Sequence, residues 1–201
     1  GESGSGKTQA LKSIASQAAL EKIPTMIIDY KNDYSVNDPS FVEASNFEVC
    51  RIGEKSLPFN PFELDLENIT FNYNPMFKVY EILDIFKRST GSTLSAKMSN
   101  ALKSAMIVAY ENKSQIDFSY RYSREELEGK LWPDFDLVMK ALDDSDAGEP
   151  TVNALHDRFD KFIDLGYLPR SGEAGSFEEL VAKNVVIGMS GVPPEIITIL
   201  S

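Results

Sequence analysis

The chain opens with Gly1-Glu-Ser-Gly-Ser-Gly-Lys-Thr8, which matches the pattern Gly-x-x-x-x-Gly-Lys-[Ser/Thr] at every defined position. Glycines let the backbone turn so that successive N–H groups point toward phosphate oxygens, and the positive end of a following helix adds to this attraction. We expect Lys7 to reach the β- and γ-phosphates of a nucleoside triphosphate and the Thr8 hydroxyl to bind Mg²⁺. The predicted nucleotide-binding residues are Gly1, Glu2, Ser3, Gly4, Ser5, Gly6, Lys7, Thr8 and Gln9, and Lys7 is also the predicted catalytic residue.

The residues after this loop support its interpretation as a phosphate-binding site. Residues 7–22 contain strong helix formers and apolar residues at roughly helical spacing, and Pro24 ends the pattern. The apolar run Thr25-Met-Ile-Ile-Asp29 is typical of a buried parallel strand that ends on a carboxylate. A glycine loop, a helix and a strand in this order form a nucleotide-binding unit, so a chance glycine-rich turn is the weaker alternative.

The remaining pattern predicts a helical segment between two parts of a sheet. Residues 47–52 and 183–189 read as strands, and residues 76–88, 94–112, 135–143 and 152–165 read as helices. Two prolines in Leu57-Pro-Phe-Asn-Pro-Phe-Glu-Leu64 exclude regular structure and predict a rigid connector.

We therefore predict an α/β fold: a partial, RecA-like parallel sheet of the P-loop NTPase type with an all-helical insertion. Residues 1–61 are expected to form the first part of the core, residues 62–182 the insertion, and residues 183–201 a returning strand and helix. Because Gly1 already belongs to the motif, we expect the chain to be a fragment whose other core strands lie outside it.

Composition limits the class of protein. A net charge of −11 argues against a surface that coats nucleic acid by bulk charge, although a few basic residues could still line a pore. One cysteine and one histidine exclude an internal disulfide and a Cys/His zinc site. Without an apolar run long enough to span a membrane or a signal-like start, we expect a cytoplasmic protein.

Two pairs of charged residues outside the loop have competing interpretations. Asp29 and Asp33 follow the second strand, where they either approach the active-site water shell or a neighbouring subunit, or cap their own loop. Lys87 and Arg88 end a predicted helix, where they either touch a nucleic-acid backbone or interact with the helix dipole. Nothing in the local sequence singles out an arginine that could act on a neighbouring subunit's nucleotide.

Taken together, Gly1 to Thr8, the helix and Met26-Ile-Ile-Asp-Tyr-Lys-Asn-Asp-Tyr34 resemble the HerA and FtsK group of DNA-pumping ATPases. The segment Val185-Val-Ile-Gly-Met-Ser-Gly-Val-Pro193 is similar to a strand of these proteins whose sequence is an apolar run followed by Asp, Leu, Ser, Gly, Leu and Pro. Gly188 stands where that aspartate would be. The stretch from Leu57 to Pro61 further resembles HerA-type ATPases of bacterial anti-phage systems, including restriction linked to DNA phosphorothioation.

The resemblance implies an ATP- and Mg²⁺-dependent hexameric ring that translocates DNA, with a nuclease or other defence effector as a partner. It also implies an aspartate-glutamate pair on a later strand, which we expect after Ser201. Two other functions remain open: an ATPase of conjugative or type IV secretion machines, and a switch module that binds ATP and hydrolyses it slowly. Small-molecule kinases and GTPases rank last, because no Asn-Lys-x-Asp guanine signature is present and the predicted helical insertion is larger than a simple lid requires.

Overall fold

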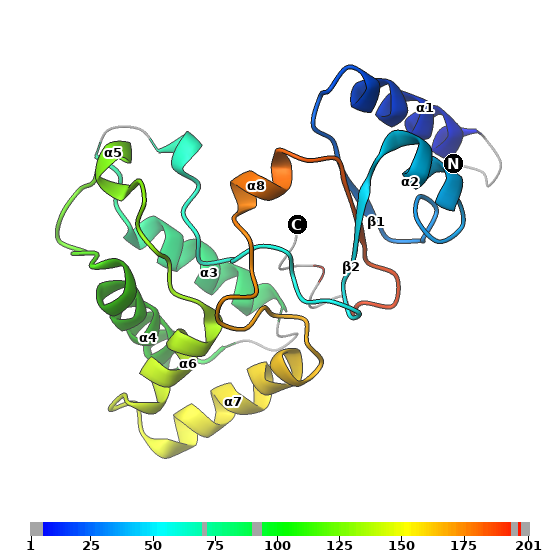
Figure 1. The fold of residues 1–201 in the computed structure, drawn as a ribbon. Coiled ribbons are helices and arrows are strands. Elements are labelled where there is room, and N and C mark those ends of the chain that lie inside the picture. The colour runs from blue at the N-terminus through cyan, green and yellow to red at the C-terminus, as the bar shows by residue number, and fades with distance from the viewer. Residues whose placement is uncertain (1–5, 70–71, 90–93, 194–196, 198–201) are drawn as a thin grey trace.

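The computed structural model describes residues 6–69, 72–89, 94–193 and 197 of the chain (Figure 1). Three short strands form a parallel sheet in the order β1-β3-β2, where β1 is Met26–Asp29, β2 is Glu48–Arg51 and β3 is Val185–Gly188. All four residues of β3 are buried, as expected for the central strand of a parallel sheet. The three strands lie where the sequence predicts them, which confirms the predicted α/β class.

Both faces of the sheet are covered. Alternate residues of each strand point to opposite faces, so each face packs against a different group of side chains. On one face, Ile27 and Val186 pack with Ala15, Phe41 and Phe47 beneath two helices, α1 (Lys7–Leu20) and α2 (Pro39–Ser45). On the other face, Ile28, Cys50, Val185 and Ile187 join the main hydrophobic core. The thiol of Cys50 is buried, which raises its pKa.

Helix α1 forms where its sequence predicts, but its large apolar side chains do not face the sheet. Leu11, Ile14 and Leu20 are more than half exposed, whereas Lys12 and Ala15 are buried against α2 and the sheet. The apolar spacing thus identifies the helix correctly, but it does not identify the face that packs.

Residues 52–184 leave the sheet after β2 and return to it at β3 (Figure 1). Helix α4 (Ala96–Ser114) is central to this part and packs against α3 (Met76–Ser89), α6 (Phe135–Asp143) and α7 (Glu149–Asp164). Phe86, Phe135 and Phe159 join three of these helices, with ring centroids 4.8–5.8 Å apart. The four longer predicted helices are confirmed, with ends displaced by at most three residues.

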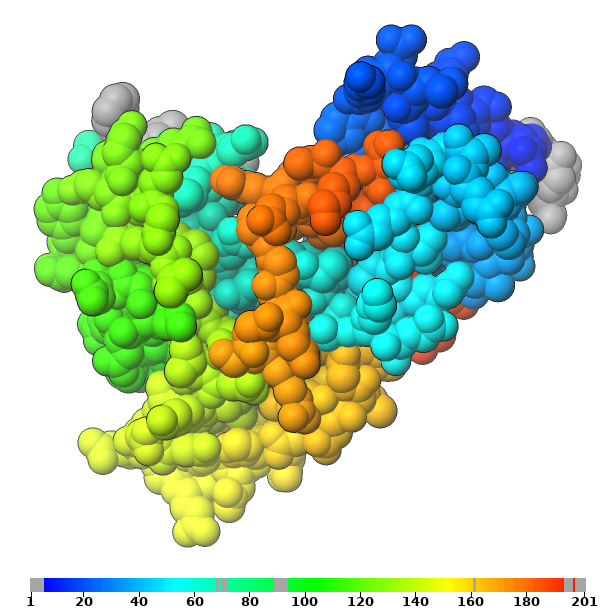
Figure 2. Space-filling model, in the orientation of Figure 1, coloured from blue at the N-terminus to red at the C-terminus, as the bar shows by residue number. Residues whose placement is uncertain are grey.

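Four short elements are not predicted by apolar spacing, although capping residues begin them: α2, the 3₁₀ turn η1 (Leu66–Asn68), α5 (Arg124–Leu127) and α8 (Phe177–Val181). They are too short for apolar periodicity to appear. In the space-filling view, α8 lies at the base of a notch between the N-terminal part and the helical part (Figure 2). The predicted helix after Pro194 lies mostly outside the described residues.

The proline-rich connector takes no regular structure, as predicted, and it links the sheet to the helices. Leu57 and Phe62 are fully buried. The Tyr110 hydroxyl of α4 donates a hydrogen bond to the Phe62 carbonyl, and the Asn60 amide donates one to the carbonyl of Pro133 at 2.8 Å. These bonds anchor the connector at two points of the helical part.

Within the described ranges, no helix is long and apolar enough to cross a membrane.

Candidate nucleotide-binding site

The described part of the glycine loop consists of Gly6, Lys7, Thr8 and Gln9. Gly6 precedes α1 with φ +73°, in the left-handed region that favours glycine. A Cβ at this position would meet no atom within 4 Å, so backbone conformation, and not space, requires the glycine. Gly1, Glu2, Ser3, Gly4 and Ser5 lie outside the described residues.

The start of α1 has the properties of an anion-binding site. The Ala10 N–H bonds the Gly6 carbonyl at 3.0 Å, which begins the helical hydrogen-bond pattern. The N–H groups of Lys7, Thr8 and Gln9 precede it and therefore have no acceptor within the helix. The first turn contains no acidic residue, and Lys7 is exposed. This positive helix end, with an exposed lysine and a hydroxyl beside it, fits a triphosphate bound with Mg²⁺.

A second lysine holds the helix in place. Lys12 Nζ lies 2.9 Å from Asp38 Oδ2, and the Lys12 side chain is 9% exposed. The same ammonium lies 5.6 Å from the ring centroid of Tyr34 and 5.8 Å from that of Phe41. Hydrogen bonds from Ser40 and Lys12 lower the pKa of Asp38 to about 2. Lys12 therefore fixes α1 against α2, a role that no sequence pattern predicts.

The Asp29 carboxylate is buried and caps the loop that follows β1. Its oxygens accept hydrogen bonds from the backbone N–H groups of Lys31, Asp33 and Tyr34 at 3.2, 3.0 and 3.0 Å. Asp33 takes part through its backbone. Of the two interpretations of this pair, these contacts correspond to loop capping. Figure 1 places this loop and the amino end of α1 toward the same side of the molecule.

Lys87 and Arg88 both contact Asp84 within α3. Lys87 Nζ lies 3.3 Å from the Asp84 carboxylate, and Arg88 Nε donates to the Asp84 carbonyl at 3.1 Å. These are the contacts of basic residues at the carboxyl end of a helix. They account for both residues without a nucleic-acid partner, and a DNA contact here stays a prediction.

Across the part of the chain that the structure describes, no group of three or more His, Cys, Asp or Glu residues could hold a metal ion. The Thr8 hydroxyl is a ligand type that Mg²⁺ accepts, and Mg²⁺ at such loops also binds triphosphate oxygens and retains several waters.

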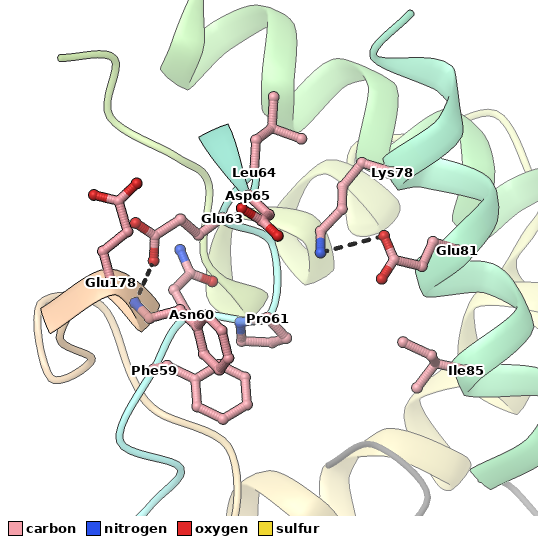
Figure 3. Close-up of a pocket in the computed structure, with 11 residues that line it drawn as sticks. Phe59, Asn60, Pro61, Glu63, Leu64, Asp65, Lys78, Glu81, Ile85 and Glu178 are labelled. Atoms are coloured by element: carbon pink, nitrogen blue, oxygen red, sulfur yellow. Dashed lines mark hydrogen bonds and ion pairs between the residues drawn. The ribbon is translucent and has the colours of Figure 1, made fainter. Parts of the chain in front are cut away.

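A separate cavity of about 230 Å³ lies between the connector, α3 and α8 (Figure 3). Its walls include Phe59, Ile85 and Phe177. Glu63, an acidic residue of its lining, accepts a hydrogen bond from the Phe177 N–H at 2.9 Å at the start of α8. Lys78 pairs with Glu81 at 3.4 Å on the α3 side of the cavity.

Comparison with known families identifies the class of domain. A family model described as "Helicase HerA, central domain" matches residues 1–200. The chain belongs to the HerA central-domain family. This confirms the resemblance seen in the sequence and places the glycine loop in a HerA/FtsK-type P-loop ATPase domain.

The fold of this HerA-family domain is similar to that of a solved structure, VirB4 of Thermoanaerobacter pseudethanolicus, with a TM-score of 0.67. The two are 13% identical, and the match covers 99% of this chain and 52% of the VirB4 chain. The chain thus spans about half the length of the protein it matches, and the likeness concerns the fold. A comparison with functionally curated proteins gave no significant match.

Proposed function

We propose that this HerA-family domain binds and hydrolyses ATP with Mg²⁺ and uses the energy to translocate DNA. The observation that carries the proposal is the left-handed Gly6 directly before α1, followed by an exposed Lys7 and by Thr8, in a chain of this family. The uncapped positive end of α1 supports phosphate binding at this place.

Each residue of the loop has a distinct task in this proposal. The backbone N–H groups from Gly1 to Gln9 hold phosphate oxygens, and Lys7 neutralises charge on the β- and γ-phosphates. Thr8 orients Mg²⁺, which supplies electrostatic stabilisation to phosphoryl transfer when bound. Asp29 keeps the neighbouring loop in shape, and Asp33 is a candidate for contact with water or with a neighbouring subunit.

The finer biological assignments rest on family resemblance. They are a hexameric ring around DNA, a cytoplasmic location, a role in anti-phage defence or phosphorothioation-dependent restriction, and a nuclease or other effector as partner. The alternative is an ATPase of conjugation or type IV secretion. The fold is compatible with both, because likeness at 13% identity reports on architecture alone.

The decisive experiment measures steady-state ATP hydrolysis by the full-length protein with and without duplex and single-stranded DNA, for the unaltered protein and for Lys7→Ala. We expect DNA to stimulate hydrolysis and Lys7→Ala to abolish both the stimulation and productive ATP binding. Lys12→Ala is the matched control: it removes a lysine from the same helix, so it should lower stability and leave ATP affinity within about threefold.

Unchanged ATP affinity in Lys7→Ala would refute the nucleotide site. Hydrolysis that is lost in Lys7→Ala but indifferent to DNA would refute the translocase and favour the secretion alternative.

The contact proposed at Lys87 and Arg88 is tested by replacing both residues with alanine. If they touch DNA, the salt dependence of DNA binding should become shallower, by up to two phosphate contacts. An unchanged slope would leave only their bonds to Asp84.

A further inference from the structure

Gly188 and Arg51 lie side by side at the carboxyl end of the sheet. They are partners in the register of β3 and β2. A Cβ added to Gly188 would lie 3.4 Å from Arg51 Cγ. Gly188 is not among the glycines with positive φ, so its conformation does not require glycine. The missing side chain therefore leaves space next to Arg51, at the position where the resemblance to HerA-type proteins leads one to expect an aspartate.

The Arg51 guanidinium lacks a strong partner among the described residues. Its Nε is buried and has no hydrogen-bond acceptor there. Its Nη1 lies 3.6 Å from Glu54 Oε2, in a pair whose side chains are 40% and 70% exposed. Exposed pairs of this kind contribute little, and a buried N–H without an acceptor is costly. A small rotation of the guanidinium toward an oxyanion would supply that acceptor.

The space next to Arg51 is a cavity of about 540 Å³, here called the Arg51 pocket. The Asn32 amide and the Ser190 hydroxyl contribute to its lining, together with Gly53 and Gly191, which have φ of +101° and +80°. The Gly53 N–H already donates to the Lys55 carbonyl at 3.0 Å, so the candidate donors to a ligand here are side chains. The pocket lies at the carboxyl ends of parallel strands, where ligands bind in open α/β sheets. Residues 6–9 of the glycine loop do not contribute to its lining.

Among the described residues that line the pocket, Arg51 and Glu54 are the charged ones, and Arg51 is the group that can bind an anion. Asp29 occupies the β1 position beside Gly188, so it is two strand spacings from Arg51, roughly 10 Å. Its carboxylate is already satisfied by three backbone N–H groups. Glu54, 70% exposed, can turn into solvent when a stronger acceptor arrives. The guanidinium group of arginine can bind two phosphate oxygens at once. The exposed Glu54 carboxylate, 3.6 Å away, makes a weaker contact with Arg51.

We propose that the Arg51 pocket binds a phosphate-type oxyanion through the Arg51 guanidinium, in the space that an aspartate at position 188 would fill. The same chemistry suits free inorganic phosphate and a phosphodiester of a nucleic-acid strand. Residues 6–9 of the glycine loop do not line this site, and its test is independent of the proposed ATPase activity.

The test uses the full-length protein carrying Lys7→Ala, so that the glycine loop does not dominate phosphate binding. Inorganic phosphate is titrated at constant ionic strength while the arginine Nε–H signals are followed by NMR and the melting temperature by calorimetry. We expect one Nε–H signal to shift with saturation, and this signal to be absent from the Arg51→Gln protein. Arg51→Gln should weaken phosphate binding about tenfold or more. Equal affinity in the two proteins would overturn the proposal.

Position 188 provides a matched pair of variants. Gly188→Asp places a carboxylate against Arg51 and should weaken phosphate binding about tenfold or more, whereas the neutral Gly188→Asn should weaken it less. Far-UV circular dichroism and the melting temperature establish that both variants fold. If Gly188→Asp fails to fold, the protein with Arg51 is compared with Arg51→Gln and Arg51→Lys. Equal phosphate affinity of these three proteins refutes the site.

A second titration with a short thymidine oligonucleotide distinguishes the two sources of the oxyanion. A response of the Arg51 signal to inorganic phosphate but not to the oligonucleotide assigns free phosphate. A response to the oligonucleotide at lower concentration assigns a phosphodiester. If neither probe shifts the signal, the pocket does not bind phosphate groups.

Discussion

At the residue scale, neighbouring side chains of one type have unrelated tasks. Lys7 and Lys12 both belong to α1, yet Lys7 is exposed at the amino end of the helix and Lys12 is buried against Asp38. Asp29 and Asp38 flank one loop: Asp29 accepts backbone N–H groups of that loop, and Asp38 accepts the Phe41 N–H at the start of α2. The motif identifies Lys7, whereas the structural role of Lys12 is visible only from its environment.

Thr8 offers a test of Mg²⁺ binding at this scale. Because its hydroxyl is the metal ligand that this loop provides, Thr8→Ala should raise the Mg²⁺ concentration needed for half-maximal ATP binding about tenfold. Thr8→Ser keeps the hydroxyl and should remain within about threefold of the unaltered protein. Titration of ATP binding against Mg²⁺ measures both, and identical curves for the alanine and serine variants would contradict the ligand role.

At the scale of elements, two contacts join parts of the chain that are distant in sequence. Tyr110 ties α4 to the connector, and His156 ties α7 to the end of α6. Both involve polar groups whose partners the apolar pattern does not reveal. Each contact can be removed with a small change of side chain.

Tyr110→Phe removes the hydroxyl and leaves the buried Phe62 carbonyl without its donor. We expect the free energy of unfolding to fall by about 1–3 kcal/mol. Tyr120→Phe is the matched control, since its hydroxyl donates to Glu126 on the surface, and it should change stability by less than about 0.5 kcal/mol. Chemical denaturation measures both. Equal effects would mean that the bond to the connector does not hold α4 in place.

His156 makes the stability of the α6–α7 junction depend on pH. Its ring nitrogens lie 2.7 Å from Asp143 and 3.1 Å from Asp160, and mainly the hydrogen bond to Asp143 raises the pKa of His156 above its usual 6.5. A raised folded-state pKa adds stability that is fully present below pH 6.5 and is lost as pH rises through the folded-state value.

We therefore expect the unaltered protein to exceed His156→Asn in stability by up to about 1 kcal/mol near pH 5.5, and by less near pH 8.5. Asp143→Asn should reduce the same pH dependence while it retains the imidazole. Denaturation at both pH values checks this, and a difference that grows with pH would reverse the assignment.

At the scale of the whole molecule, one hydrophobic cluster runs from the sheet to the far helices. It contains Cys50 and Ile187 of the strands and also Phe159 of α7. Since no apolar boundary divides the cluster, we expect the sheet and the helical part to unfold together.

The single cysteine and the single tryptophan report on the two parts separately. Reactivity of the buried Cys50 thiol follows the sheet, and fluorescence of Trp132 follows the helical part. We expect the two urea transitions to coincide, and Phe159→Ala to shift both by about 3–5 kcal/mol. A shift of the Trp132 transition alone would show that the helical part is an independent unit.

The sequence by itself determines the phosphate-binding loop, the parallel strands, the longer helices and the irregular connector. These depend on local rules: glycine conformation, apolar spacing, and the geometry that proline forbids. Loop capping by Asp29 was also among the sequence interpretations, because short acids commonly bind nearby backbone N–H groups.

Only the tertiary structure decides which face of α1 packs, that Lys12 pairs with Asp38, and that Gly188 lies beside Arg51. The register that places Gly188 beside Arg51 joins strands separated by the whole helical part. Such pairings arise from the packing of segments that are distant in the sequence. Local sequence does not predict them, because burial and partners are properties of the assembled fold.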